Sequence, residues 1–315
     1  MTAENGDPTL RLEAFTRAVA LAAALSLSAL PALADPAGFA FLEVPAGARA
    51  SAMGGAYASV GEGVEAAFWN PAGLAGVHGF QITASHYEFL EHLRQAQFGV
   101  AGKLWGGGVS GSVRALYSEP ITARDELGNE IGTFGSHDLE FAFGYGGVLS
   151  PGLRAGGTFQ VIRERVSDFS ATTWALGGGL TWDPAALPRL RTTLSVHNIG
   201  PDAAYNFDGV RGSPVALPSA VQVGASYGIP VGGLDVRGAL ESRITRGRPG
   251  VGMIGLEAGH ASGAALRAGF RVNDEATDFS VGAGYATGGL RFDYAFVPYK
   301  LELGETHRLS LTAQF

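Results

Sequence analysis

The chain has no cysteine, and only 16% of its 315 residues are charged. Without cysteine it cannot form disulfides, nor the thiolate sites that hold structural zinc or iron–sulfur clusters. Its net charge of −7 and its lack of a Lys/Arg-rich run argue against nucleic acid as a partner. The seven histidines match no metal-binding spacing, so we expect neither a metal nor another cofactor.

Long hydrophobic runs are also scarce, and the one present lies near the start of the chain. Arg11 and Arg17 precede an apolar run over 18–30, which the small-residue stretch 31–34 follows. A charged region, an apolar region and an Ala-Leu-Ala site together predict a signal peptide over residues 1–34. The alternative is a transmembrane anchor, but the run is shorter than the ~20 residues that a spanning helix needs.

The chain does show alternation between large apolar residues and small or polar ones. Because 46% of the residues are hydrophobic, this alternation must be what keeps their side chains away from water. In 139–145 and 290–296, large apolar residues alternate with small or charged ones, which is the period of a β-strand. We count fourteen such segments. They lie near 79–88, 95–105, 108–118, 137–147, 153–165, 172–182, 189–199, 219–229, 233–244, 250–260, 264–273, 278–287, 289–299 and 305–315.

Segment length and the pattern of connections favour a membrane barrel. A tilted membrane strand needs about 9–11 residues, whereas soluble strands have a mode of roughly 5–6. Short Gly- and Pro-rich turns alternate with longer links, among them 119–136, 166–171 and 200–218. We therefore predict an all-β, transmembrane outer-membrane β-barrel of about 14 antiparallel strands over residues 78–315, surrounded by outer-membrane lipid. The alternative fold is a soluble secreted β-protein with polar outward faces.

The last strand places Leu309, Leu311, Ala313 and Phe315 on one face. A terminal aromatic strand of this kind is typical of the signal that barrel proteins present to the barrel-assembly machinery. We therefore predict Phe315 as an assembly signal, although an ordinary edge strand could also end on Phe. Barrel closure would remove the hazard of an exposed hydrophobic edge.

Residues 35–77 carry no strand alternation and form the candidate plug of the barrel. Side chains alone fill the interior of a barrel of about eight strands. The wider lumen of a fourteen-stranded barrel therefore needs another segment to fill it. Gly54 and Gly55 permit close packing and positive φ. Pro71 keeps Asn70 out of the α region, and Asn70 can bond its own backbone across a turn. The local alternative is a capped helix over 63–69 that ends in this turn.

Charged residues in the predicted strands face the lumen, because an Arg on the lipid side near the midplane would cost ~2–4 kcal/mol. Two interpretations are open: ion pairs that brace the plug, which the interspersed signs favour, or a conducting path. The main luminal positions are Arg237, Glu241, Arg267, Arg271, Arg291 and Asp293, and the same alternation adds Arg114, Asp235, Arg243 and Glu257.

The N-terminal motifs carry a family resemblance. The string from Gly47 through Met53-Gly54-Gly55 to Trp69-Asn70-Pro71-Ala72-Gly73-Leu74 resembles the start of the PorV/PorQ outer-membrane proteins, which are similar to the FadL-like group of hydrophobic-compound channels. Asn70, Pro71 and Ala72 would be the Asn-Pro-Ala box of the plug, with Gly73 following. The resemblance implies either a part in type IX secretion, with secretion-system components or secreted cargo as partners, or passage of hydrophobic small molecules.

An enzymatic alternative also exists, but we do not expect an enzyme. A barrel-borne outer-membrane lipid hydrolase would need a Ser, a His and an acidic group within hydrogen-bond reach at the outer rim. His197 and Asn198 could contribute to such a triad, yet no nucleophile motif accompanies them.

Overall fold

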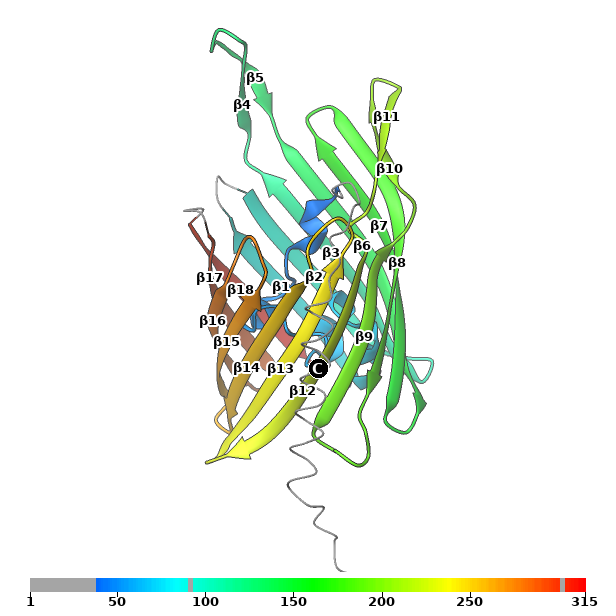
Figure 1. Ribbon diagram of the computed structural model, residues 1–315, viewed down its shortest axis with the longest axis vertical. Helices are drawn as coiled ribbons and strands as arrows, with labels where there is room; N and C mark the ends of the chain where they lie inside the picture. The colour runs from blue at the N-terminus through cyan, green and yellow to red at the C-terminus, as the bar shows by residue number, and fades with distance from the viewer. Residues whose placement is uncertain (1–37, 90–92, 301–303) are drawn as a thin grey trace, which may run out of the picture.

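A computed structural model describes residues 38–89, 93–300 and 304–315 of the chain (Figure 1). The predicted signal peptide, residues 1–34, lies outside the described residues. Sixteen strands share one sheet. Of these, β10 and β11 form a hairpin beyond the wall, and the other fourteen form the wall of an antiparallel barrel. The predicted strand number is therefore confirmed.

The wall strands lie close to their predicted positions, usually within two or three residues at each end. Their bounds are β1 Phe80–Glu88, β2 Leu93–Leu104, β3 Gly107–Ser118, β6 Ser136–Ser150, β7 Leu153–Val166, β8 Phe169–Trp182, β9 Leu190–Ile199, β12 Ala220–Val231, β13 Leu234–Thr245, β14 Val251–His260, β15 Ala264–Val272, β16 Phe279–Thr287, β17 Leu290–Pro298 and β18 Glu305–Gln314.

The barrel closes by pairing its first and last strands. Strand β1 pairs antiparallel with β18 from Gln81 opposite Gln314 to Glu88 opposite His307. At the end of this seam, Phe315 N donates to Phe80 O (2.8 Å), and the two rings lie 6.3 Å apart. Every wall strand thus has a partner on each side, so the wall leaves no free sheet edge.

Three of the longer links predicted from the sequence are different in the structure. The link 119–136 contains the hairpin β4 (Ile121–Arg124) and β5 (Glu130–Phe134), and the link 200–218 contains β10 (Ala203–Phe207) and β11 (Val210–Val215) (Figure 1). The predicted link 166–171 is wrong, because β7 and β8 continue to a turn at Ser167 and Asp168. Cross-strand bonding extends these strands beyond the segments in which alternation is visible.

Polarity is inverted relative to a soluble protein. Large apolar side chains such as Phe143, Leu256 and Leu309 are exposed on the outside, whereas Arg114 and Glu140 are buried inside. Apolar atoms pointing outward and buried charges pointing inward are what a bilayer around the wall requires. Among the described residues, no helix is long and apolar enough to cross a membrane, and that finding does not bear on crossing by strands. The soluble-fold alternative therefore does not hold.

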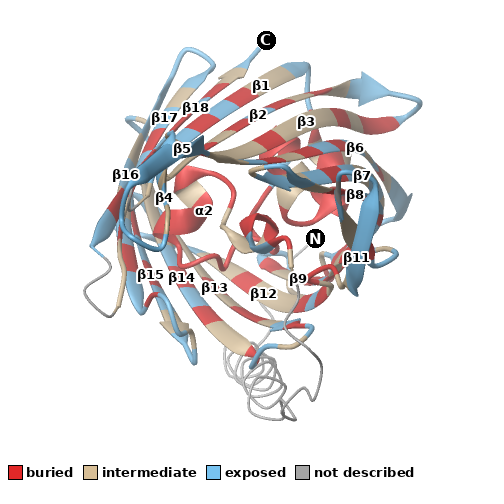
Figure 2. Cartoon of the chain, turned by 90° about the horizontal axis from the view of Figure 1, so that it is seen from above, coloured by how far each residue is buried: buried red, intermediate tan, exposed pale blue. Residues whose placement is uncertain are grey.

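The described part of the chain before β1, residues 38–77, lies inside the barrel (Figure 2). It contains four short helices and no strand: the 3₁₀-helix η1 (Ala40–Glu43), the helix α2 (Ala48–Ala52), and the 3₁₀-helices η2 (Gly63–Phe68) and η3 (Pro71–Gly76). We call Gly38–Val77 the plug. The core of the protein lies between the plug and the wall, where Met53, Tyr57 and Trp69 of the plug pack against Ala239 and Met253 of the wall.

The C-terminal aromatic residue gives the first prediction. Deletion of Phe315, or Phe315→Asp, should reduce assembly in the outer membrane with little effect on synthesis. Both changes remove the ring contact with Phe80, and the deletion also removes the terminal backbone bond. Heat-modifiability on a gel, with total protein measured by immunoblot, checks this. Normal amounts of the heat-shifting form in the variant would contradict the assigned role.

The orientation of the strands gives the second prediction. Phe141→Arg and Phe292→Arg should each destabilise the barrel by roughly 2–4 kcal/mol, because both side chains are about half exposed to lipid. Ala142→Ser, which faces the lumen beside Phe141, should be mild. Urea unfolding in lipid vesicles measures the difference, and equal effects at the two faces would refute the orientation.

Candidate functional site

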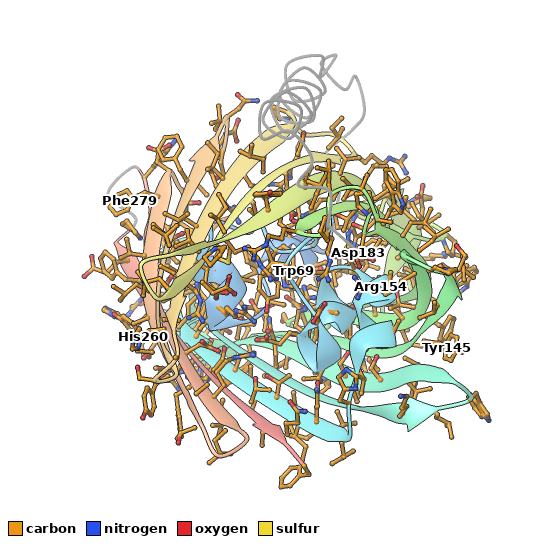
Figure 3. The ribbon with its side chains drawn as sticks, turned by 90° about the horizontal axis from the view of Figure 1, so that it is seen from below. Trp69, Tyr145, Arg154, Asp183, His260 and Phe279 are labelled. Carbon is orange, nitrogen blue, oxygen red and sulfur yellow. The ribbon has the colours of Figure 1, made fainter. Side chains whose placement is uncertain are left out.

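The candidate site is the plugged lumen, in which small residues of the plug meet glycines of the wall. An added Cβ at Gly156 would collide with Pro71, at Gly269 with Gly54, and at Gly282 with Ala52. Glycine at these wall positions therefore allows the plug backbone to approach the strands directly. Seen from below, Trp69 lies within the lumen, whereas Tyr145 and Phe279 lie on the outside of the wall (Figure 3).

Gly54 and Gly55 both adopt positive φ, of 66° and 81°, where the chain turns after α2. A Cβ on Gly54 would lie 3.0 Å from Phe270 N in the wall. The backbone of this turn is bonded on both sides: Gly54 N donates to Ser280 Oγ (3.1 Å), and Arg271 Nε donates to Gly54 O (2.8 Å). Glycine is required here by both the conformation and the contact.

The Asn-Pro-Ala box forms the start of η3 against β8. Asn70 is the N-cap of η3, and its Oδ1 accepts a bond from Ala72 N (3.1 Å). Its Nδ2 donates to Leu180 O (3.2 Å) and Thr181 Oγ1 (3.1 Å) of the wall. Pro71 occupies the first position of η3, where a missing N–H costs nothing. Together with the buried Ala72 and Gly73, the box fastens the plug to β8.

A closed chain of charges links the plug to β14, β15 and β17. It joins three arginines and three carboxylates in alternating sign, with Tyr57 completing the loop. The contacts run from Arg49 to Glu257 (2.6 Å), Glu257 to Arg267 (2.5 Å), Arg267 to Asp293 (2.9 Å), Asp293 to Arg291 (2.8 Å), Arg291 to Glu65, Glu65 to Tyr57 (2.8 Å) and Tyr57 to Arg49 (3.3 Å).

We call these seven residues the charge ring. Glu65 is buried, and burial alone would raise its pKa, but Arg291, Arg49 and the Tyr57 hydroxyl outweigh that effect and hold the pKa of Glu65 below its ordinary value. The ring therefore holds Glu65 in its charged form. Charges of alternating sign that join into pairs favour the bracing interpretation, which stays a prediction beside the conducting path.

The remaining predicted luminal charges have separate roles. Glu241 accepts bonds from Ala58 N (3.1 Å), Ser59 N (2.8 Å) and Ser59 Oγ (2.7 Å), and so holds the plug to β13. Arg271 bonds Gly54 O, as described above, and pairs with Asp274 (2.8 Å). Arg237 faces the same lumen but forms no ion pair within the described part of the chain.

Sequence reasoning missed the plug side of this arrangement. Arg49 and Glu65 were not predicted as site residues, nor was Glu62, which pairs with Arg191 (2.7 Å) and Arg154 (3.5 Å) on the wall. The signal in the sequence that could have identified these three residues was the presence of charge within a segment of small residues. Arg49 lies 208 positions from its partner Glu257, so alternation within one strand could not reveal the pair.

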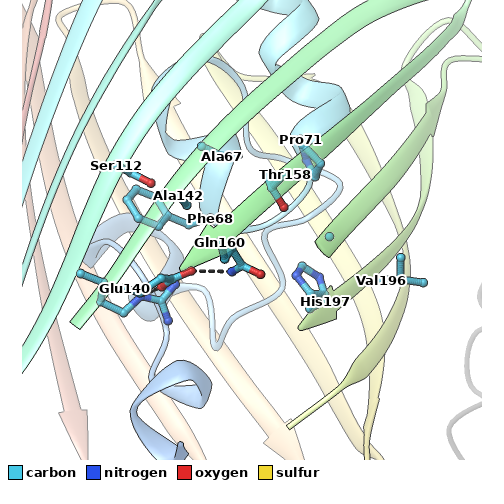
Figure 4. Close-up of a pocket in the computed structure, with 12 residues that line it drawn as sticks. Ala67, Phe68, Pro71, Ser112, Glu140, Ala142, Thr158, Gln160, Val196 and His197 are labelled. Carbon is cyan, nitrogen blue, oxygen red and sulfur yellow. Dashed lines mark hydrogen bonds and ion pairs between the residues drawn. The ribbon is translucent and has the colours of Figure 1, made fainter. Parts of the chain in front are cut away.

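A small polar cavity of about 20 Å³ lies between η2, η3 and the wall (Figure 4). Its lining includes Arg114, Glu140, Gln160 and His197, with Gln160 Nε2 donating to Glu140 Oε1 (2.5 Å). This volume suits about one water molecule. Ser195 Oγ lies 2.9 Å from His197 Nε2, and Ser195 is buried.

Of the apolar clusters between plug and wall, one is built around the first described residues of the plug. Phe39 and Phe41 of the plug lie there among wall side chains, and Phe39 stacks on Tyr205 with ring centroids 6.5 Å apart. We call this region the apolar luminal cluster. Its members are Phe39, Phe41, Leu42, Ile162, Ala171, Ala175, Ala203 and Leu217, with Leu116 and Tyr205 packed against it.

The site holds no evident metal chemistry, since no three His, Asp or Glu side chains gather as ligands in the part of the chain that the structure describes. No protein-family model matches the chain. No curated protein matches it either.

Solved structures do resemble it. The toluene transporter TodX of Pseudomonas putida matches with a TM-score of 0.60 at 12% identity, over 86% of this chain and 99% of that one. The monoaromatic hydrocarbon channel CymD matches with a TM-score of 0.57 at 15% identity, over 86% and 98%. A FadL homologue of Pseudomonas aeruginosa matches with a TM-score of 0.54 at 10% identity, over 90% and 100%. At such identities the likeness establishes the fold: a FadL-like outer-membrane barrel, which with its apolar outer face indicates the outer membrane as its location.

The Asn-Pro-Ala box gives the third prediction. Asn70→Ala should leave the barrel assembled but loosen the plug, because Leu180 O and Thr181 Oγ1 lose their donor at ~1–3 kcal/mol. The chain lacks cysteine, so Ala66→Cys at a fully buried plug position provides a single thiol probe. Thiol labelling should be slow in the otherwise unmodified protein and faster with Asn70→Ala.

Gly54→Leu serves as the severe comparison. A leucine there would be strained by the positive φ, and its side chain would press against the backbone of the wall. It should accelerate labelling more than Asn70→Ala. Rapid labelling of Ala66→Cys without any second substitution would show that the plug is not held in the lumen.

Proposed function

We propose that the protein passes hydrophobic small molecules across the outer membrane, with the apolar luminal cluster as their binding surface. The observation that carries this proposal is the position of that cluster. It is formed by the first described residues of the plug, apart from the cluster around Met53, Tyr57 and Trp69, and it draws on β7, β8 and β10 together. The neighbouring structures TodX and CymD are described as toluene or monoaromatic hydrocarbon channels, which supports the same class of solute here.

The plug divides naturally into a firmly held part and a lightly held part. Residues 47–77 carry the charge ring, the Glu241 contacts and the Asn-Pro-Ala box. The stretch 38–44 is held by Gly38 N to Ala216 O (3.0 Å), Arg114 Nη1 to Leu42 O (3.0 Å) and the Arg248–Glu43 pair (2.8 Å). A hydrophobic solute would take the space of Phe39 and Phe41 by moving this stretch, while the rest of the plug stays in place.

The secretion hypothesis gains no support from these neighbours. The resemblance to the PorV/PorQ family stays a prediction, as do secretion-system components or secreted cargo as partners. The hydrolase alternative gains no support from the geometry of the site. Ser195 contacts His197, but no carboxylate is bonded to His197 in the described part of the chain.

A pair of neighbouring substitutions tests the proposal. Ile162→Thr places a hydroxyl in the apolar luminal cluster and should weaken binding of toluene by about five- to 150-fold, from an unpaired polar group costing ~1–3 kcal/mol. Val161→Thr makes a similar change on the adjacent lipid-facing position and should leave binding unaltered. Binding is measured on purified protein, and uptake of labelled toluene in cells provides the second readout.

Two results would overturn the proposal. One is the absence of saturable toluene binding by the unmodified protein. The other is equal binding by Ile162→Thr and the unmodified protein, since the cluster would then not be the binding surface.

A further inference from the structure

Two arginines point outward from the upper part of β7. Their orientation follows from their neighbours: Ile162 is fully buried in the apolar luminal cluster, and Glu164 accepts a bond from Tyr205 on the luminal side. Successive side chains of a strand point to opposite faces. Arg163 and Arg165 therefore face away from the lumen, and both are exposed.

These arginines lie at the outer edge of the apolar surface. The outward residue below Arg163 on β7 is Val161, which pairs with Phe141 on one side and Trp174 on the other, all three exposed. Arg163 is two residues beyond this row, or about 7 Å along the strand. This side of the barrel is built from its longest strands, β6, β7 and β8 (Figure 1).

No carboxylate among the described residues forms an ion pair with Arg163 or Arg165. The cross-strand neighbours of Arg163 are Leu139 and Thr172, and those of Arg165 are His137 and Ser170. Arg165 Nε donates to Ser167 O (2.9 Å), which is a neutral carbonyl. Asp168, in the adjoining turn, forms no ion pair with either arginine in the described part of the chain.

Two other exposed arginines near this end of the barrel are paired, whereas Arg211 of β11 forms no ion pair in the described part of the chain. Arg94 contacts Glu119 (2.7 Å) and Glu88 (3.4 Å), and Arg124 contacts Glu130 (2.8 Å). Arg163 and Arg165 are instead two like charges on one face of a strand, with His137 beside them. Within the described part of the chain they have no counter-charge, and they lie at the level where lipid headgroups meet hydrocarbon.

We propose that Arg163, Arg165 and His137 bind the phosphate of an anionic lipid in the outer leaflet. The planar guanidinium presents parallel donors that match phosphate oxygens in a bidentate manner. The aliphatic stem of each arginine can lie along the apolar surface while its head stays at the polar boundary. The site is on the lipid-facing side of the wall and is independent of the luminal passage proposed above.

The test compares matched double variants of the full-length barrel in phosphatidylcholine nanodiscs. Binding of diphosphoryl lipid A is measured by native mass spectrometry, with dephosphorylated lipid A as the lipid control. The unmodified protein should prefer the phosphorylated form. Arg163→Gln/Arg165→Gln should weaken that binding by about 25-fold, at about fivefold for each basic residue near an anionic surface.

Arg124→Gln/Arg211→Gln is the protein control, because it removes the same charge from exposed positions on the hairpins β4–β5 and β10–β11. It should bind the phosphorylated lipid as the unmodified protein does, and both double variants should keep the heat-shifting form. Equal affinity of Arg163→Gln/Arg165→Gln and the unmodified protein would overturn the proposal. So would equal weakening by the two double variants, or displacement of the lipid by inorganic phosphate at matched concentration, which would show a free-anion site.

Discussion

The structure depends on the alternation of charge across the boundary between plug and wall. Placing arginines and carboxylates in a narrow lumen costs solvation, and each charge is stabilised only if an opposite charge lies within contact distance. On the wall, Glu257, Arg267, Asp293 and Arg291 form a chain of ion pairs. Arg49 and Glu65 of the plug pair with the two ends of this chain, Glu257 and Arg291. Removal of the plug would leave Glu257 without Arg49 and Arg291 without Glu65 in an emptied lumen. The plug is therefore part of the electrostatic structure of the barrel as well as its filling.

The same boundary explains the distribution of small residues. Charge pairs fix the plug only if its backbone comes close to the strands, and that approach is possible because glycines such as Gly156, Gly269 and Gly282 offer no side chain at the contact. Where the wall carries Ile162 and Ala175 instead, the contact is apolar and the aromatic rings of Phe39 and Phe41 fill it. Firm polar attachment and a lightly held apolar contact thus coexist in one lumen. In the passage that we propose, a hydrophobic solute would compete for the second without breaking the first.

The outer surface follows a different rule from the lumen. In contact with lipid, apolar exposure is favourable and charge is confined to the edges of the hydrocarbon. The exposed Phe141, Val161 and Trp174 obey this rule, and Arg163 marks its upper limit on β7. Inside the barrel, charge is admitted wherever it is paired. One strand therefore carries two independent sets of constraints on alternate residues.

The sequence by itself determined the strands and their orientation, because alternation is a local consequence of backbone geometry. The predicted segments 153–165 and 264–273 match β7 and β15 closely, and Arg267 and Asp293 were placed on the correct face. It also indicated the turn at Asn70 from the steric effect of Pro71, although the predicted helix before it is a 3₁₀-helix. Only the tertiary structure decided that Arg49 meets Glu257, that the plug backbone lies on wall glycines, and that two outer links form hairpins. Those contacts join residues far apart in the chain, and they depend on how the plug threads the closed barrel, which no local pattern records.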